Sequence, residues 1–143
     1  FHLMGTMNAL ENVALPLTFR GTARKERLKR ADRMLDMVSL AKQKKHLPNQ
    51  LSGGQQQRVG VARALVSDPK IVFADEPTGN LDSHTSEEVM RLMQRIVREQ
   101  KRTLVMVTHD PNEAAYADRV FQIIDGKIVH IQENRRSKEN EKA

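Results

Sequence analysis

A short apolar strand, a helix and a second strand follow one another in this sequence, and this order constrains the fold most. The run from Ile71 to Ala74 is continuously apolar between turn residues, which predicts a strand buried on both faces. Thr103 to Val107 is a second strand-like run. It follows a predicted helix from about Ser83 to Gln100, which we expect to begin with a capping box at Thr85 and Glu88. Strand, helix and strand make a βαβ unit, so we expect an α/β protein with a parallel sheet.

Two further helices are predicted before this unit. From Ala23 to Leu40, apolar residues recur at three- and four-residue steps and so share one helix face, until Pro48 breaks the pattern. From Leu51 to Ser67 a second helix is predicted, closed by the Asp68-Pro69 dipeptide. Gly60 inside it costs about 1 kcal/mol relative to alanine. Close packing against a neighbouring element is one explanation of this glycine.

Residues 119–143 are predicted to form a hairpin followed by a tail. Asp125-Gly126 separates two apolar runs, Arg119 to Ile124 and Lys127 to Ile131. This dipeptide predicts a tight turn in which both central residues have positive φ. Residues 133–143 are polar without apolar periodicity, so we expect a frayed tail there.

Composition excludes several classes of protein. With 38% hydrophobic and 29% charged residues the chain fits a globular protein, and its apolar runs are far shorter than the ~20 residues that span a bilayer. The absence of cysteine excludes a disulfide framework. The net charge of +6 gathers in residues 24–33 and 42–45, which favours a solvated helix face. Nucleic acid is the less favoured partner, because aromatic residues make up only 3% and provide no stacking platform.

The segment Ser52-Gly53-Gly54-Gln55 lies where a loop enters a helix. Unsatisfied backbone N–H groups and the helix dipole favour an anion at such a point, and glycines let a phosphate approach the backbone. Taken alone, the same pattern also fits a plain capped helix. Both readings stay open at this stage.

Asp75 and Glu76 follow the first predicted strand, and His109 follows the second. The carboxyl ends of parallel strands form the edge at which open α/β folds bind ligands. Two adjacent acids there are costly unless they are paired or hold a cation, and Mg²⁺ binds through one or two carboxylates plus phosphate and water. Structural acids at strand ends and a histidine in a helix cap are the plainer alternatives. If the two strands are neighbours, His109 shares an edge with Glu76.

Together these pieces resemble the ATP-binding subunits of ABC transporters. Residues 51–58, Leu-Ser-Gly-Gly-Gln-Gln-Gln-Arg, resemble the family's signature, and residues 71–77 resemble its Walker B strand. Asn80-Leu81-Asp82 resembles the D-loop, and Thr108-His109-Asp110 resembles the switch-histidine segment. The resemblance covers residues 1 to about 131. It implies an α/β fold: a partial P-loop NTPase (RecA-like) core with parallel strands plus the ABC helical subdomain.

The branch of the family is indicated by two segments. Ala74 to Asp82 and Ala9 to Val13 are most similar to lipoprotein-release, macrolide-export and antimicrobial-peptide-export ATPases. The resemblance implies ATP and Mg²⁺ as cofactors. It also implies a domain plan of residues 1–50 as a partial helical subdomain, 51–132 as the C-terminal half of the ATPase core and 133–143 as the polar tail.

The resemblance implies catalytic roles for three side chains. Asp75 would hold magnesium, through water, and Glu76 would be the general base that activates the attacking water. His109 would contact the γ-phosphate and keep Glu76 and the water in line. Positioning and preorganised charge, rather than covalent chemistry, would carry the catalysis.

The resemblance also implies a site shared between two subunits. Ser52, Gly53, Gly54 and Gln55 would touch the γ-phosphate of a nucleotide held by a second ATPase subunit, in a head-to-tail dimer. Asp82 would lie at that dimer interface.

One element of the family is absent from residues 1–143, because no Gly-x-x-x-x-Gly-Lys-Ser/Thr occurs in them. The family order would put this N-terminal phosphate-binding (P-loop) portion before Phe1. We therefore expect a piece of a longer subunit that, alone, neither binds ATP tightly nor hydrolyses it. We also expect exposed sheet edges, which self-association would cover.

The favoured function is a cytoplasmic ATPase at the inner face of the cell membrane that couples ATP hydrolysis to export or extraction of a substrate. It would dock onto a membrane permease through residues 8–47. The alternatives are a DNA-repair or chromosome-maintenance ATPase, disfavoured because no heptads of a long coiled coil occur, and an inactive piece that only folds or oligomerises.

Overall fold

The computed structural model describes residues 2–134 and forms two compact units, Phe1–Val107 and Thr108–Ala143. The first unit contains α1 (Ala9–Phe19), α2 (Arg24–Met37), the 3-10 turn η1 (Pro48–Gln50), α3 (Gly53–Leu65), β1 (Ile71–Asp75), α4 (Ser83–Glu99) and β2 (Thr103–Val107). The second unit contains α5 (Pro111–Ala114), β3 (Arg119–Ile124) and β4 (Lys127–Glu133). The domain boundary predicted after residue 50 falls inside the first unit and stays a prediction.

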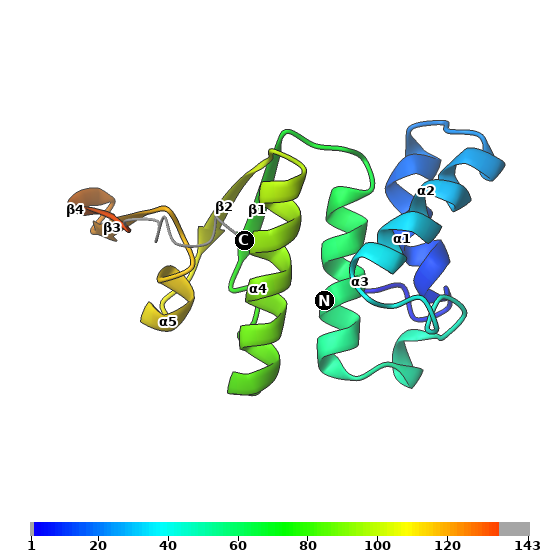
Figure 1. Cartoon of the computed structure of the whole chain (residues 1–143), viewed down its shortest axis with the longest axis horizontal. Helices are drawn as coiled ribbons and strands as arrows, with labels where there is room; N and C mark the ends of the chain where they lie inside the picture. The colour runs from blue at the N-terminus through cyan, green and yellow to red at the C-terminus, as the bar shows by residue number, and fades with distance from the viewer. Residues whose placement is uncertain (1, 135–143) are drawn as a thin grey trace, which may run out of the picture. The chain divides into compact units, whose positions relative to one another are not determined.

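The strands β1 and β2 pair in parallel, with Val72 opposite Leu104 and Asp75 opposite Val107. Because α4 connects them, the predicted βαβ unit and the α/β fold are confirmed. Figure 1 shows α1, α2 and α3 grouped together, with α4 beside α3.

The core of the first unit is built from the apolar faces of its four α-helices. The predicted stripe on α2 is confirmed in part, since Ala31 and Leu35 are buried and Leu28 is half-buried. The helix ends at Met37, however, well before Pro48. Ser39 takes a left-handed φ of 63°, which stops the helix, and Pro48 instead begins η1.

The expectation that β1 is buried on both faces is wrong. Val72 is 8% exposed and joins the core with residues of α3 and α4, whereas Phe73 on the alternate face is 76% exposed. Side chains alternate along a strand, and within residues 2–134 the sheet of β1 has only two strands. One face of the sheet therefore stays uncovered within residues 2–134.

Asn12 is the polar anchor of α1. Its amide is fully buried and accepts a hydrogen bond from the Met4 N–H at 2.8 Å. Its Nδ2 donates to the carbonyl oxygens of Met4, Met7 and Asn8 at 3.1, 2.9 and 3.1 Å. These bonds fix the segment before α1 to the helix, since a buried amide stabilises the fold only when it is satisfied.

In the second unit, β3 and β4 form the predicted antiparallel hairpin. Asp125 and Gly126 have φ angles of 49° and 72°, which confirms the tight turn. Glu133 belongs to β4 rather than to the predicted tail. Residues 135–143 of that tail lie outside the described residues.

Candidate functional site

Asp75 and Glu76 lie at the carboxyl edge of the parallel pair. Asp75 is the last residue of β1 and lies opposite Val107, the last residue of β2. The backbone N–H of Glu76 donates to the carbonyl oxygen of Val107 at 2.9 Å, so the pairing extends one residue beyond the strand. Both acids therefore stand at the edge where open α/β folds bind ligands.

Glu76 has a left-handed backbone with a φ of 44°. For a residue with a long side chain this conformation costs about 1 to 3 kcal/mol, and such residues gather at active sites. Two backbone bonds hold it there: the one to Val107 and one from the Gly79 N–H to the Glu76 carbonyl oxygen at 3.2 Å. The extended backbone of β1 thus ends at Glu76, where the chain turns.

Ser52 and Gln55 cap the start of α3 reciprocally. The Ser52 Oγ accepts from the Gln55 N–H at 3.3 Å, and the Gln55 Oε1 accepts from the Ser52 N–H at 3.0 Å. Within residues 2–134 the backbone N–H groups of Gly53 and Gly54 have no acceptor. A capped helix start with two open N–H groups fits both readings of this segment, because these donors can still face an anion.

The two glycines of this segment pack against the start of α4. A Cβ on Gly54 would lie 2.4 Å from the Cγ2 atom of Thr85, and a Cβ on Gly53 would lie 3.2 Å from the Cδ2 atom of Leu81. A side chain at position 54 therefore forces Thr85 or the helix start to shift. Gly60 differs, because nothing lies within 4 Å of its Cβ position. Close packing does not explain Gly60.

Asp82 is the N-cap of α4. Its carboxylate accepts from the Thr85 N–H at 3.0 Å and from the Thr85 hydroxyl at 2.6 Å. These bonds hold the pKa of Asp82 below its ordinary value of 3.8, and the bond from the Thr85 hydroxyl has the largest effect. The predicted capping box at Thr85 and Glu88 is therefore wrong: Asp82 caps the helix one turn earlier, and Glu88 instead pairs with Arg58 of α3 at 2.9 Å.

The packing just described brings the predicted signature and D-loop residues together. Gly53 and Gly54 contact the segment that begins at Leu81, and the ion pair of Arg58 with Glu88 joins the same two helices further along. Sequence reasoning missed Thr85 as the centre of this contact. The pattern of an Asp before a helix with a Thr three residues later is the signal that could have found it.

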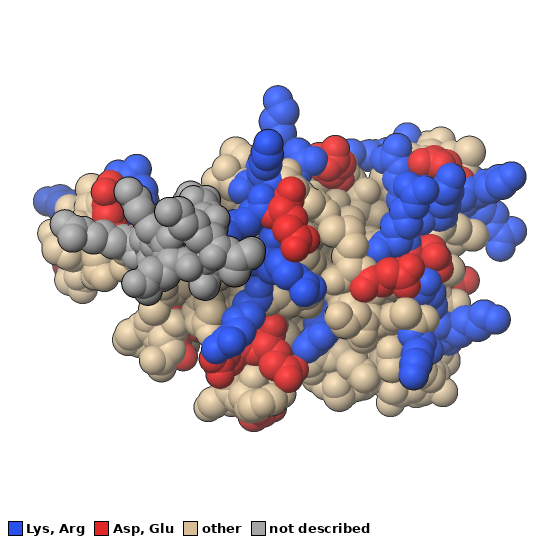
Figure 2. Space-filling view, viewed as in Figure 1, with Lys and Arg blue, Asp and Glu red and all other residues tan. Residues whose placement is uncertain are grey.

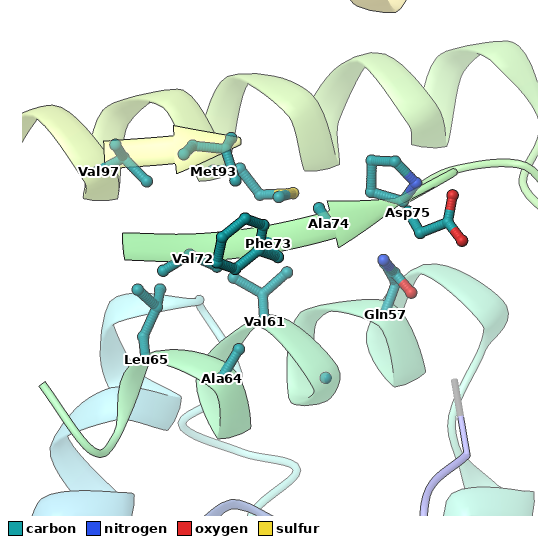
Figure 3. A pocket seen from close by; sticks show the side chains of 13 residues that line it. Gln57, Val61, Ala64, Leu65, Val72, Phe73, Ala74, Asp75, Met93 and Val97 are labelled. Carbon is teal, nitrogen blue, oxygen red and sulfur yellow. The ribbon is translucent and has the colours of Figure 1, made fainter. Parts of the chain in front are cut away.

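A cavity of about 150 Å³ lies beside β1, between α3 and α4. Figure 3 shows Gln57 of α3 and Asp75 of β1 at one end, with Val72 and Phe73 further along the strand. Its lining is mostly apolar, and it is smaller than the ~300 Å³ at which ligand pockets begin. The candidate site is therefore the exposed edge at Asp75 and Glu76, not this cavity.

His109 belongs to the second unit, two residues beyond the end of β2. The Thr108 hydroxyl accepts from the Asp110 N–H at 3.1 Å, and Asp110 caps α5 by accepting from the Asn112 N–H at 2.8 Å. Because Asp110 is the N-cap of α5, His109 is not the helix cap. The His109 residue is exposed. The meeting of His109 with Glu76 stays a prediction.

The exposed carboxylate of Asp75 at the carboxyl edge of the sheet is a suitable ligand for magnesium. Within residues 2–134 no group of three or more His, Cys, Asp or Glu side chains could hold a metal ion. Mg²⁺ needs no such group, since one exposed carboxylate together with phosphate oxygens and water is sufficient. Asp75 is exposed and provides that carboxylate.

Comparisons with known proteins agree with this arrangement. The family described as ABC transporter matches residues 1–79. The macrolide export ATP-binding/permease protein MacB of Shewanella sp. (strain ANA-3) is 49% identical over 134 residues, 94% of this chain and 20% of that protein. The uncharacterized ABC transporter ATP-binding protein MJ1508 of Methanocaldococcus jannaschii is 49% identical over 131 residues, 92% of this chain and 58% of that protein.

Solved structures give the same result. The dimeric ATP-binding cassette MJ0796, in a post-hydrolysis state bound to ADP and Pi, matches with a TM-score of 0.77 and 44% identity, over 94% of this chain and 60% of that chain. The chain thus spans a fifth of its MacB relatives and about three fifths of the single cassettes. No helix within residues 2–134 has the length and apolar character needed to span a bilayer. With a family match over more than half of its length, the chain belongs to the ABC transporter family.

Proposed function

We propose that this chain is part of an ATP-hydrolysing subunit that drives an exporter. The observation that carries the proposal is the pair Asp75 and Glu76 at the carboxyl edge of a parallel sheet, with Glu76 held in a left-handed conformation. The macrolide-export name of several relatives favours the export branch.

In this proposal Glu76 acts as the general base for the attacking water. Backbone hydrogen bonds with Val107 and Gly79 fix the backbone of Glu76. This lowers the conformational-entropy cost of placing its carboxylate against the water. His109 contacts the γ-phosphate and keeps the water in line with Glu76. Asp75 would hold Mg²⁺, through water, and the bound ion would supply positive charge that offsets the charge of the phosphate oxygens.

The start of α3 completes the site of a second copy in a head-to-tail dimer. Ser52, Gly53, Gly54 and Gln55 face the γ-phosphate of a nucleotide bound to the opposite subunit, and Asp82 lies at that interface. The two open N–H groups of the glycines support this, since they are donors at the positive end of a helix. The dimeric cassette among the matching structures favours the same assembly.

The family membership supports a proposal for the partners and the place of action. A membrane permease docks on residues 8–47, and the subunit works in the cytoplasm at the inner face of the cell membrane. Residues 1–143 do not contain the phosphate-binding loop of the family. The 143 residues alone are then inactive.

ATP turnover of the full-length subunit tests the role of Glu76. Glu76→Gln keeps the side-chain shape and removes the base, so we expect ATP binding to persist and turnover to fall by a factor of about 10² to 10⁴. Glu87→Gln is the matched control, because Glu87 lies on the exposed face of α4 and pairs with Arg91. Equal turnover of Glu76→Gln and Glu87→Gln would remove Glu76 from its role.

A further inference from the structure

The excess positive charge of this chain is concentrated at one end of the first unit. Residues 20–33 contain seven basic and two acidic side chains, a net charge of +5 out of +6 for the whole chain. Figure 2 shows Lys and Arg side chains gathered over α2. This surface plays no part in the site at Asp75 and Glu76.

On α2 the basic residues form a stripe. Lys25, Lys29 and Arg33 follow one another at four-residue steps, so they share one face, and all three are exposed. Ala31 and Leu35 on the opposite face are buried in the core. We call these three residues the basic stripe.

The acids near the basic stripe are already paired elsewhere. Glu26 pairs with Arg30 at 2.9 Å, and Lys44 holds Asp32 and Asp36, at 2.7 Å each. No ion pair joins the basic stripe to another of the described residues. Its positive charge therefore faces solvent, partly offset by the Coulombic attraction of Glu26 for Lys29 and Arg33.

The basic residues at the start of α2 do not stabilise this helix. Lys25 lies in the first turn, where the helix dipole disfavours cations. The N-cap residue Ala23 provides no side-chain hydrogen bond. A charge that opposes local helix stability points to a role outside the helix.

An exposed aromatic residue stands next to this charge. Phe19, the last residue of α1, is 83% exposed. The turn after it is rigid: the Gly21 N–H donates to the Thr18 carbonyl and the Thr22 N–H donates to the Leu17 carbonyl, both at 3.0 Å, with Gly21 at a φ of 72°. This pair of bonds is a Schellman motif, which fixes the direction of the chain as it leaves α1.

Arg27 ties this turn to α2 by donating to the Thr22 carbonyl at 3.2 Å. Phe19 at the end of α1 and the basic stripe on α2 thus flank a turn that these hydrogen bonds hold in place. An aromatic ring beside several cations is the combination by which peripheral proteins bind a bilayer surface: the cations contact anionic headgroups and the ring enters the interface.

We propose that the basic stripe and Phe19 form a binding surface for an anionic phospholipid bilayer. Duplex DNA is the competing anionic partner. It is disfavoured because the exposed ring of Phe19 on this surface would find no favourable contact in the groove of a duplex. The surface and the site at Glu76 share no residue, so the inference does not depend on ATP hydrolysis. The surface lies within residues 8–47, so it rests on the proposed docking to a permease, with the bilayer around that permease as the occupant of this face. Lipid binding and turnover can therefore fail separately.

Vesicle sedimentation measures this binding directly. The 143-residue chain should sediment with phosphatidylcholine vesicles that contain phosphatidylglycerol and stay in solution with phosphatidylcholine alone, and added salt should release it. Lys25→Gln/Lys29→Gln/Arg33→Gln should weaken binding by about fivefold for each charge removed. The matched control Lys70→Gln/Lys101→Gln/Lys127→Gln removes three exposed charges elsewhere and should bind nearly as the parent does.

A fluorescence experiment tests Phe19. The sequence contains no tryptophan, so Phe19→Trp introduces a single reporter. Its emission should shift to the blue with the anionic vesicles and not with phosphatidylcholine alone. An unshifted emission, equal losses in the two triple variants, or tighter binding to duplex DNA than to the anionic vesicles at the same salt concentration would each overturn the proposal.

Discussion

Replacement of Gly54 by alanine tests the packing of the signature segment on α4. The new Cβ would lie 2.4 Å from Thr85 Cγ2, more than 1 Å inside the normal separation of about 3.5 to 4.0 Å. Thr85 cannot simply rotate away, because its hydroxyl donates to Asp82. Overpacking of this kind costs about 1 to 3 kcal/mol, from which a helix-propensity gain of up to about 1 kcal/mol is subtracted. With the full propensity gain subtracted, we expect a net loss of up to about 2 kcal/mol.

The assay is urea unfolding of the chain followed by far-UV circular dichroism, with free energies from linear extrapolation. Thr85→Ser removes the Cγ2 atom and keeps the hydroxyl that binds Asp82. The double variant Gly54→Ala/Thr85→Ser should therefore lie within about 0.5 kcal/mol of Thr85→Ser alone, which makes the coupling visible in a double-mutant cycle.

Gly60→Ala is the matched control in the same helix. Its Cβ meets nothing within 4 Å, so the substitution should stabilise the chain by up to about 1 kcal/mol. If Gly54→Ala were as stable as Gly60→Ala, or if Thr85→Ser did not relieve it, Gly54 would not be fixed by packing against α4.

Two other predictions concern stability. Asn12→Ala should cost about 2 to 4 kcal/mol in urea unfolding, because it leaves the part-buried Met4 N–H and Met7 carbonyl without their side-chain partner, and a loss under 1 kcal/mol would contradict that account. Asp82 has a lowered pKa, so its contribution is complete above pH 3.8 and is lost as the pH falls further. The stability difference between the parent chain and Asp82→Asn should thus be constant from pH 7 to about pH 5 and shrink below pH 3.8; a difference that vanishes already at pH 6 would implicate another group.

Much of the fold could be predicted from local patterns. The hairpin at Asp125-Gly126 follows from backbone geometry that two residues define, and the parallel pairing of β1 with β2 follows from the length of the connection between them. The end of α2 could not be predicted this way. The apolar spacing of α2 continues to Leu40. The Leu40 side chain is buried, but it reaches the core after a left-handed turn at Ser39 and not as part of the helix.

The candidate site could be predicted in its residues but not in its packing. The acids at the end of β1 are visible because they interrupt an apolar run. The role of Gly54 depends on Thr85, 31 positions later, and no local pattern contains that contact. The exposure of Phe73 likewise depends on which strands and helices cover the sheet, which is a tertiary property.

The central claim is that two copies share each site, with Glu76 from one copy and the signature segment at Ser52 from the other. Mixing two variants of the full-length subunit tests it most directly: Glu76→Gln lacks the base, and Ser52→Arg blocks the start of α3. Each variant alone should be inactive. In a mixed dimer one site combines an intact Glu76 with an intact Ser52, so ATP turnover should reappear at no more than half the parent rate, whereas a mixture as inactive as its components would contradict the claim.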